Sequence, residues 1–327
     1  MDKIIISVIM CVYNTPLNVF KEAVLSILNQ TFINFELIIV DDASSTNLFL
    51  DDIFSDSRIR IIKNCENKGP SFCRNEALKI SRGKYIAIMD SDDISEANRL
   101  EEQIKFLKAN KNIVACGSWF RFIGNKTHEV KRTIPSRDYF RCCLLFNNEP
   151  TILNPSVMIP KKILDKNNIS WNESLRLGED YLMWVQLSEI GTIVNCDKIL
   201  LNYRVHDTQS TSKNNRDVIG QNTWLIKKYQ LDKIGIIPSE KKARMLSKSF
   251  VKSKKELNEI RILLEDIKNA NKQSKYLNSE CLEKRCNEQL IRLIATIKNP
   301  FIFLQIYFSK KYHLFAQNLL KTRFFKK

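Results

Sequence analysis

The sequence predicts an α/β protein with a doubly wound, mixed but mainly parallel sheet, followed by a helical and basic C-terminal extension. Two observations predict this fold class. Apolar, β-branched runs alternate with amphipathic helical patterns through the first third of the chain, as in strands joined by crossover helices. The charge is divided unevenly: residues 1–210 hold 26 Lys and Arg against 26 Asp and Glu, whereas residues 211–327 hold 26 against 10 and carry the whole net charge of +16.

The first strand is predicted over residues 4–13, a nearly continuous apolar run typical of a strand that is buried on both faces. The run is short, lacks a small-residue cleavage site and has Asp2 beside its only lysine, so a signal peptide is not expected. A helix is expected over residues 14–30, where apolar side chains recur at helical spacing. Further strands are predicted over residues 35–42, 58–62 and 85–90, with helices from Pro70 to Gly83 and over residues 98–110.

The middle of the chain is harder to read. Residues 113–124 predict a pair of strands, and residues 124–160 form a polar region punctuated by prolines. A helix is then expected over residues 178–191, ending at its terminal glycine, followed by a strand over residues 192–206.

A domain boundary is expected where the chain turns polar after His206. We therefore predict an α/β domain of residues 1–210 and a helical, basic region of residues 211–327. The chain contains no run of 18 uninterrupted apolar residues, so no transmembrane helix is expected. Nine cysteines, an odd number with no CxxC pair, indicate reduced thiols rather than a zinc site or a disulfide framework, and this fits a cytoplasmic protein.

Polar clusters stand at the ends of three predicted strands, and in doubly wound sheets ligands bind at the carboxyl ends of strands. Asp90 and Asp92 are two residues apart, so their side chains point to the same side of an extended chain. Hard oxygen ligands suit Mn²⁺ or Mg²⁺, which complete their coordination with water and diphosphate oxygens. The pair therefore indicates a nucleotide diphosphate substrate, although a polar turn with Ser95 capping the next helix would give the same pattern.

One other strand end and one helix start could serve the same ligand. Asp42 could accept a hydrogen bond from the imide N–H of a uracil or from a ribose hydroxyl, or it could be a turn residue. Lys68 and Arg74 flank the start of a predicted helix, where backbone N–H groups and a guanidinium could meet phosphates. Both basic side chains could equally be solvated surface charges.

Five stretches occur in an order that resembles the inverting family-2 glycosyltransferases with the GT-A fold. They cover about residues 4–212 and read "SVIMCVYN", "QTFINFELIIVDDASST", "NKGPSFCRNEAL…GKYIAIMDSDD", "NESLRLGEDYLMWVQL" and "LLNYRVHDTQST". Each motif alone is weak, since two acids at this spacing arise by chance. The five in sequence order identify the family.

The resemblance implies roles for particular residues. It places Asp42 on the nucleotide base, Asp90 toward the ribose and the metal, and Asp92 on the metal itself. It makes Asp180 the catalytic base, with Glu179 beside it in the acceptor pocket, although acids at a helix start are also favoured by the helix dipole. The donor site implied in this way also includes Tyr13, Asn14, Arg74 and Ser91.

Three further residues are assigned on weaker grounds. In some relatives a histidine downstream of the base approaches the metal, so His206 is a candidate metal ligand, with a structural histidine as the alternative. Trp171 and Asn154 are expected to line the acceptor region, whereas core packing is expected for Trp184.

The reaction that the resemblance implies is a single displacement with inversion at the anomeric carbon. The donor would be a UDP-hexose or UDP-N-acetylhexosamine, and the acceptor a saccharide or lipid-linked saccharide in O-antigen, capsule or lipopolysaccharide synthesis. One alternative is a sugar-phosphate nucleotidyltransferase, but "CVYNTPLN" stands where its Gly-rich phosphate loop is expected. A non-catalytic nucleotide-sugar-binding scaffold is the other alternative, although neither the acid pair nor the proposed base is missing.

The end of the basic region has the composition of an interfacial helix on an anionic membrane. Residues 298–325 hold eight aromatic residues, several basic residues and no acid. The alternative is a helical cap whose apolar face packs on the catalytic domain and whose lysines are solvated. We expect attachment to the inner face of the cell membrane, and the helices could also pair two copies into a homodimer. Nucleic acid is not an expected partner, because no recognisable nucleic-acid-binding motif accompanies the charge.

Overall fold

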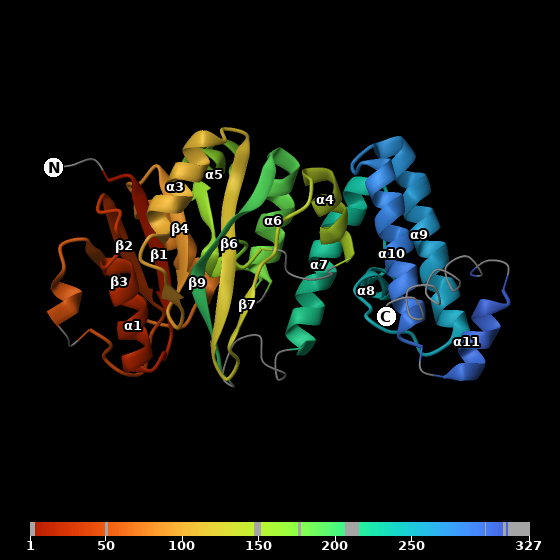
Figure 1. The fold of residues 1–327 in the computed structure, drawn as a ribbon, viewed down its shortest axis with the longest axis horizontal. Coiled ribbons are helices and arrows are strands. Elements are labelled where there is room, and N and C mark those ends of the chain that lie inside the picture. The colour runs from red at the N-terminus through yellow and green to blue at the C-terminus, as the bar shows by residue number, and fades with distance from the viewer. Residues whose placement is uncertain are drawn as a thin grey trace. The chain divides into compact units, whose positions relative to one another are not determined.

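The computed structural model describes residues 4–49, 52–146, 152–175, 178–206, 216–297, 299–309 and 312. The chain divides into two compact units. An α/β unit comprises Met1–Arg137 and Pro150–Ile219, and a helical unit comprises Asp138–Glu149 and Gly220–Lys327 (Figure 1). The residues around the predicted boundary, 207–215, lie outside the described part of the chain.

The α/β unit is built on one mixed sheet with the strand order β3-β2-β1-β4-β8-β6-β9-β5, and β7 is paired to β6 (Figure 1). The strands β3, β2, β1 and β4 are parallel, and β6 is parallel to β9, whereas β8, β5 and β7 pair antiparallel with their neighbours. This confirms the mixed, mainly parallel sheet predicted from the sequence. The strands are β1 (Ile6–Val12), β2 (Phe35–Asp41), β3 (Ile59–Lys63), β4 (Tyr85–Asp90), β5 (Ile94–Ser95), β6 (Ile113–Gly124), β7 (His128–Val130), β8 (Met158–Pro160) and β9 (Thr192–Val205).

Helices cover the sheet in the doubly wound manner. The apolar stripes of α1 (Leu17–Leu28) and α3 (Arg99–Ala109) join one buried cluster with alternate residues of β1 and β2, and α3 contacts β6 and β9. The helix α2 (Pro70–Ile80) contacts β1 and β2 but contributes nothing to that cluster, as expected for the opposite face of the sheet. Short 3-10 turns η1 (Asp52–Ser55) and η2 (Asn154–Ser156) and the helices α5 (Lys161–Asn167) and α6 (Glu179–Ile190) complete the unit.

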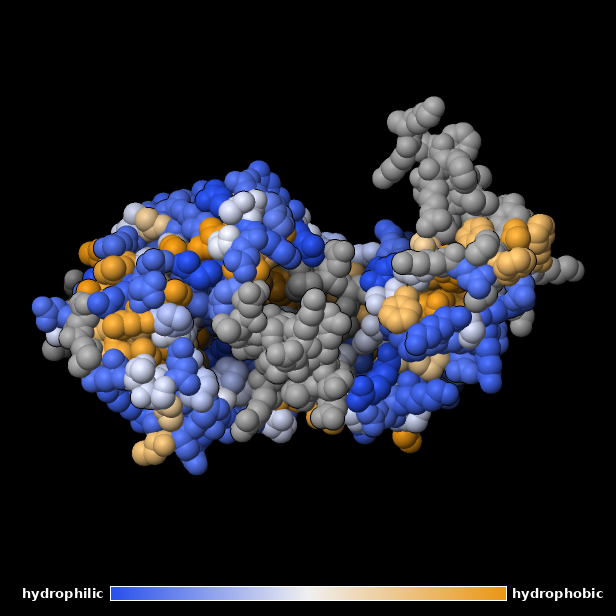
Figure 2. Space-filling model, turned by 90° about the horizontal axis from the view of Figure 1, so that it is seen from below, coloured by the Kyte–Doolittle hydropathy of each residue, from blue (hydrophilic) through white to orange (hydrophobic). Residues whose placement is uncertain are grey.

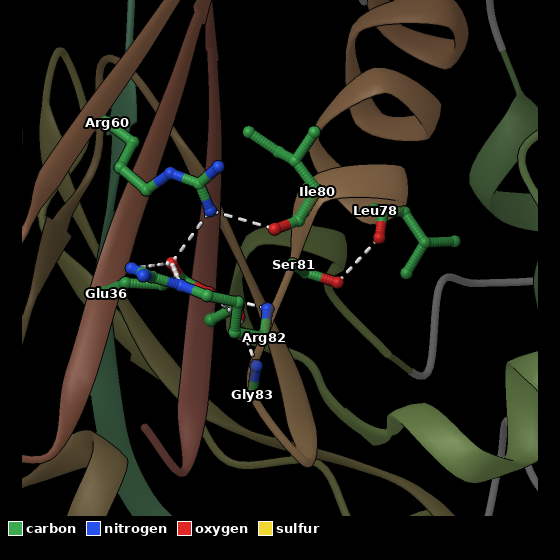
Figure 3. A network of polar contacts seen from close by, with 8 residues as sticks. Glu36, Arg60, Leu78, Ile80, Ser81, Arg82 and Gly83 are labelled. Carbon is green, nitrogen blue, oxygen red and sulfur yellow. Dashed lines mark hydrogen bonds and ion pairs between the residues drawn. The ribbon is translucent and has the colours of Figure 1, made fainter. Parts of the chain in front are cut away.

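The helix α2 ends at Ile80, three residues before the predicted Gly83, because a buried carboxylate takes the following amides. Glu36 accepts hydrogen bonds from the backbone N–H of Arg82 at 2.7 Å and from the Ser7 hydroxyl at 2.6 Å, while the N–H of Gly83 donates to Ser7 Oγ at 2.9 Å. The side chains of Arg82 and Arg60 complete this network around Glu36, at 2.7 and 3.1 Å (Figure 3). A Cβ on Gly83 would lie 2.4 Å from the Ser7 nitrogen, so only glycine fits there.

The predicted pair of strands within residues 113–124 is wrong, because these residues form the single strand β6. Gly117 lies inside the strand, where a Cβ would come within 2.4 Å of Asn195 Oδ1. Gly117 therefore allows Asn195 of β9 to approach the backbone of β6 closely, and it does not form a turn. The turn falls instead at Gly124, which has a φ of +84°.

The helical unit confirms the helical character predicted for the C-terminal region. Its core joins buried residues of α4 with those of the later helices, and α9 packs beside α10. In the part of the chain that the structure describes, no helix is both long and apolar enough to span a bilayer. The helices are α4 (Arg137–Phe146), α7 (Arg216–Ile234), α8 (Glu240–Leu246), α9 (Lys254–Ser274), α10 (Ser279–Ala295) and α11 (Pro300–Tyr307).

The helix α4 corrects the predicted domain composition, because residues 138–149 belong to the helical unit rather than to the α/β domain. Phe146 is part of the core of the helical unit, and the Tyr139 hydroxyl donates a 2.5 Å hydrogen bond to Glu288 of α10. Lys227 of α7 is fully buried and donates to the Leu144 carbonyl at 2.8 Å, and burial lowers its pKa well below the ordinary value. Contacts between segments far apart in sequence give no local signal, so the sequence does not predict that residues 138–149 join the helical unit.

Candidate functional site

The polar clusters predicted at the strand ends lie together at the carboxyl ends of the parallel strands β1, β2 and β4. The strand β1 is paired to β2 and β4, with Val12 opposite Asp41 and Cys11 opposite Asp90. The residues that follow these strands therefore start from neighbouring positions at one edge of the sheet. This confirms the convergence that the alternation of strands and helices predicts.

Asn14 holds the loop after β2 against the end of β1. It adopts a left-handed conformation with a φ of 52°, its N–H donates to Ser44 Oγ at 3.0 Å, and its Oδ1 accepts from the Ser45 N–H at 2.8 Å. Tyr13 precedes it with half of its surface exposed, so its ring is accessible for stacking on a base. Their assignment to the donor site stays a prediction.

Asp42 is buried and organises the loop that leads into α2. Its Oδ1 accepts from Asn64 Nδ2 at 2.8 Å and from the Lys68 N–H at 2.9 Å, and its Oδ2 accepts from the Gly69 N–H at 2.7 Å. A carboxylate has about four acceptor positions, three of which these donors take, and the side chain of Cys73 is also hydrogen-bonded to Asp42. The contact of Asp42 with the nucleotide base stays a prediction.

Arg74 joins the two acidic clusters of the site. From α2 its buried guanidinium reaches Glu179 at 2.5 Å and Asp90 at 3.4 Å. Burial opposes its charge, but these two carboxylates raise its pKa above the ordinary value. Sequence reasoning assigned Arg74 to phosphates; the ion pairs to Asp90 and Glu179 were not predicted.

The end of β4 carries four polar residues in different surroundings. Burial raises the pKa of Asp90 to about 6, with Arg74 opposing the shift. The Ser91 hydroxyl lies 2.8 Å from that of Thr15, so it is shared with the start of α1. Asp92 Oδ2 lies 2.9 Å from His206 Nε2 at the end of β9, and Asp93 is fully buried.

Arg204 is the residue of this site that sequence reasoning missed. Its N–H donates to the buried Asp93 carboxylate at 2.8 Å, its Nε donates to the Asp92 carbonyl at 2.8 Å, and its Nη2 contacts Glu22 of α1 at 2.6 Å. These bonds fix the end of β9 beside the end of β4 and so place His206 against Asp92. Arg204 stands two residues before the histidine in "YRVH", but its partners Asp92, Asp93 and Glu22 lie more than 100 residues away, so the sequence gives no local signal for it.

Asp180, the predicted catalytic base, occupies the first turn of α6. Burial, followed by the neighbouring charge of Glu179, raises its pKa to about 7, with Arg74 and the N–H of Tyr181 opposing the shift. A base is most effective when its pKa lies near the working pH. The carboxylate of Glu179, predicted to lie beside the base in the acceptor pocket, is buried and paired with Arg74.

Trp171 is wrongly assigned to the acceptor region. Its side chain is only 1% exposed, so no ring face is available to a sugar. Its backbone is held by Asn75, whose Oδ1 accepts from the Trp171 N–H at 3.0 Å and whose Nδ2 donates to the Trp171 carbonyl at 2.8 Å. Asn154 is buried within η2, and Trp184 is buried in the unit as expected for core packing.

The side chains of Asp92 and His206 suit a hard divalent cation whose remaining ligands come from water or a bound substrate. No group of three or more His, Cys, Asp or Glu side chains is gathered closely enough to hold a metal by itself among the residues that the structure describes. Asp92 Oδ2 and His206 Nε2 lie 2.9 Å apart, so a carboxylate oxygen and an imidazole nitrogen stand side by side at the strand ends. Two protein ligands with open positions for diphosphate and water fit Mn²⁺ or Mg²⁺.

Three comparisons relate the chain to known proteins, beginning with its family. The family model "Glycosyl transferase family 2" matches residues 7–167. An uncharacterized glycosyltransferase of Methanocaldococcus jannaschii is 37% identical over 63% of this chain and 72% of the relative. The Escherichia coli UDP-Glc:alpha-D-GlcNAc-diphosphoundecaprenol beta-1,3-glucosyltransferase WfgD is 32% identical over 67% of this chain and 87% of the relative.

Solved structures agree with the fold. The structure of S. aureus TarS 1–349 in complex with UDP-GlcNAc matches with a TM-score of 0.61 and 18% identity, over 98% of this chain and 91% of that chain. The chain belongs to glycosyltransferase family 2, and it is a glycosyltransferase whose α/β unit has the GT-A fold. This membership excludes the predicted alternative of a sugar-phosphate nucleotidyltransferase.

Proposed function

We propose that the chain transfers a hexose or N-acetylhexosamine from a UDP-sugar to a saccharide or lipid-linked acceptor, with inversion at the anomeric carbon. The fold it shares with TarS, solved in complex with UDP and with UDP-GlcNAc, supports a nucleotide-sugar donor. The name of WfgD, which acts with UDP-Glc on a diphosphoundecaprenol-linked acceptor, supports a lipid-linked acceptor in surface-glycan synthesis such as O-antigen, capsule or lipopolysaccharide. Such an acceptor would place the reaction at the inner face of the cell membrane.

The observation that carries this proposal is the bridge made by Arg74. One guanidinium contacts both Asp90, at the strand end assigned to the donor, and Glu179, the residue directly before the proposed base. Because the side chain is buried, its two partners are held at a fixed separation. Donor acids and base therefore belong to one site rather than to two independent surfaces.

Asp92 and His206 are the residues that would hold the metal, and Asp90 lies close enough to add to its electrostatic field. When bound, a divalent cation supplies positive charge that neutralises the charge developing on the departing diphosphate. In the free protein burial raises the pKa of Asp90, and repulsion from the charges of Asp92 and Glu179 adds to the shift. A cation held by Asp92 and His206 would relieve this repulsion and would supply positive charge for the diphosphate of the donor.

Asp180 performs the proton transfer. Its carboxylate accepts the proton of the acceptor hydroxyl while that oxygen attacks the anomeric carbon from the face opposite the nucleotide. The bond from the anomeric carbon to the diphosphate oxygen breaks, and the nucleoside diphosphate leaves. Arg74 and Glu179 hold the first turn of α6 in place during this step.

The substitution Asp180→Asn tests the proposal, because asparagine keeps the shape of the side chain and cannot accept the proton. Transfer should fall by a factor of about 10² to 10⁴, the usual contribution of a positioned base. Calorimetric titration with UDP and Mn²⁺ should give nearly the affinity of the wild type. Substantial residual transfer by a correctly folded variant would reject Asp180 as the base.

A further inference from the structure

The helix α11 has two apolar faces that meet different surroundings within the helical unit. On its inner face, Ile306 and the following Tyr312 are buried, and Phe303 packs against the same core as α9 and α10. This face attaches the helix to its own unit.

The outer face of α11 exposes a stripe of large apolar side chains. Phe301 is 75% exposed, Leu304 is 49% exposed and Phe308 is 75% exposed. Their spacing of three and four residues places them on one side of the helix. In Figure 2, hydrophobic residues gather at the end of the helical unit where α11 lies, toward the right of the picture. A helix that is apolar on both faces is typical of a buried helix, so this stripe calls for a partner.

The charge of the surrounding sequence indicates the chemistry of that partner. After Glu288 the chain contains no acidic residue, whereas residues 289–327 include eight Lys and Arg. Lys298 precedes the helix by two residues, and Lys310 and Lys311 follow Phe308 by two and three. Aromatic side chains combined with lysines suit the headgroup region of an anionic bilayer, where rings enter the acyl boundary and ammonium groups meet phosphates.

We propose that Phe301, Leu304 and Phe308 form a lipid-facing surface that inserts into the headgroup region of an anionic phospholipid bilayer. The inner face of α11 anchors the helix to the protein, and the outer face anchors the protein to the lipid. The proposal is independent of the strand-end site, because every residue it uses lies in the helical unit.

The test is sedimentation of the full chain with vesicles of phosphatidylcholine and phosphatidylglycerol, compared with vesicles of phosphatidylcholine alone. The wild type should bind the anionic vesicles and be released by salt. The double substitution Phe301→Ser/Phe308→Ser should reduce the partition coefficient by about 100-fold or more, since each buried aromatic ring contributes about tenfold. Ile237→Ser is the matched control, because Ile237 is 94% exposed but lies between α7 and α8, and it should bind like the wild type.

Three results would overturn the proposal. The wild type would fail to bind anionic vesicles, the double variant would bind them as well as the wild type, or the control would lose binding equally. A dimer seen by light scattering that the double variant alone dissociates, with no change in vesicle binding, would assign the stripe to a second copy instead. Calorimetric UDP binding by each variant verifies folding and separates failure of this proposal from failure of the nucleotide site.

Discussion

Asp180 can serve as a base near neutral pH because the native protein makes its ionised form unfavourable. Burial is the main cause of its raised pKa, the charge of Glu179 adds to the shift, and Arg74 limits it to about 7. The same residue would titrate near 4 on an unfolded chain. Ionisation of Asp180 therefore lowers the stability of the fold while it prepares the base.

A pH dependence follows from this shift. Since only the ionised carboxylate accepts a proton, kcat/KM should rise with pH and level off above about 7. The measurement is the pH profile of kcat/KM at saturating Mn²⁺. A profile that is flat between pH 5 and pH 8, where an unshifted aspartate stays ionised, would contradict the assignment.

Asp180→Asn also has a predicted effect on stability. The folded-state pKa of Asp180 is raised, so its ionisation costs stability that grows as pH rises from about 4 to about 7. Asparagine resembles the protonated form and avoids this cost. The variant should therefore melt at a higher temperature than the wild type at pH 8 and within error of it at pH 4. Equal midpoints at both pH values would show that Asp180 is not shifted.

Two substitutions of Arg74 separate its charge from its geometry. Arg74→Gln removes the charge that lowers the pKa of Asp180, so the rise in kcat/KM should move to higher pH. Arg74→Lys keeps the charge but cannot span Glu179 and Asp90 with a planar fork, so the rate should fall while the profile stays in place. If Arg74→Gln left the pH midpoint unchanged and Arg74→Lys left the rate unchanged, Arg74 would be excluded from the site.

At the scale of elements, the end of β9 is positioned by Arg204. If the bonds from Arg204 to Asp92 and Glu22 align His206 with Asp92, Arg204→Gln should raise the Mn²⁺ concentration for half-maximal UDP binding by about tenfold. Glu22→Gln removes only the contact to α1 and should have a smaller effect. The rate at saturating Mn²⁺ should change little. A lower rate with unchanged metal dependence would mean that Arg204 contacts the substrate instead.

At the amino ends of the strands, Glu36 of β2 pairs with Arg82, which follows α2, and with Arg60 of β3 (Figure 3). Burial acts to raise the pKa of Glu36, but hydrogen bonds from Ser7, Arg82 and Arg60 outweigh it and leave the pKa lowered. The resulting stability is present above the unfolded pKa near 4.3 and is lost as pH falls through the folded value.

Glu36→Gln should therefore destabilise the protein at pH 7 by about 2 kcal/mol, since the guanidinium partners are partly exposed and retain some hydration. Its difference from the wild type should shrink on acidification below about pH 4. Chemical denaturation at several pH values measures both effects. A difference that is constant with pH would show that the carboxylate charge is not what stabilises this end of the sheet.

Local patterns were sufficient to predict most elements of the α/β unit and the convergence of Asp42, Asp90 and Tyr13 at one edge, because strand direction alone determines that edge. The end of α2, the continuity of β6 at Gly117 and the burial of Trp171 depend on side chains distant in sequence. The ion pairs of Arg74 and Arg204 depend on the same kind of contact. These features arise from tertiary packing and have no signature in a local window.

At the scale of the whole molecule, the two units carry different chemistry. The α/β unit holds the acids, the arginine bridge and the proposed base, and the helical unit holds the excess positive charge and the exposed stripe of α11. Residues 1–210 have no net charge, so attraction to an anionic surface arises in the C-terminal part of the chain. Donor chemistry and membrane attachment can therefore be altered by separate substitutions.

The central claim is that the acids at the strand ends bind a nucleotide diphosphate together with a divalent cation. Thermal unfolding with UDP, with and without Mn²⁺, tests it most directly, because a ligand at 100 times its Kd stabilises the native state by about 2.7 kcal/mol. The account predicts a higher midpoint with UDP and Mn²⁺ together, no shift with UDP alone, and no shift in Asp92→Asn. The control Asp52→Asn, at an exposed acid of η1, should behave like the wild type. An equal shift without metal, or in Asp92→Asn, would contradict the account.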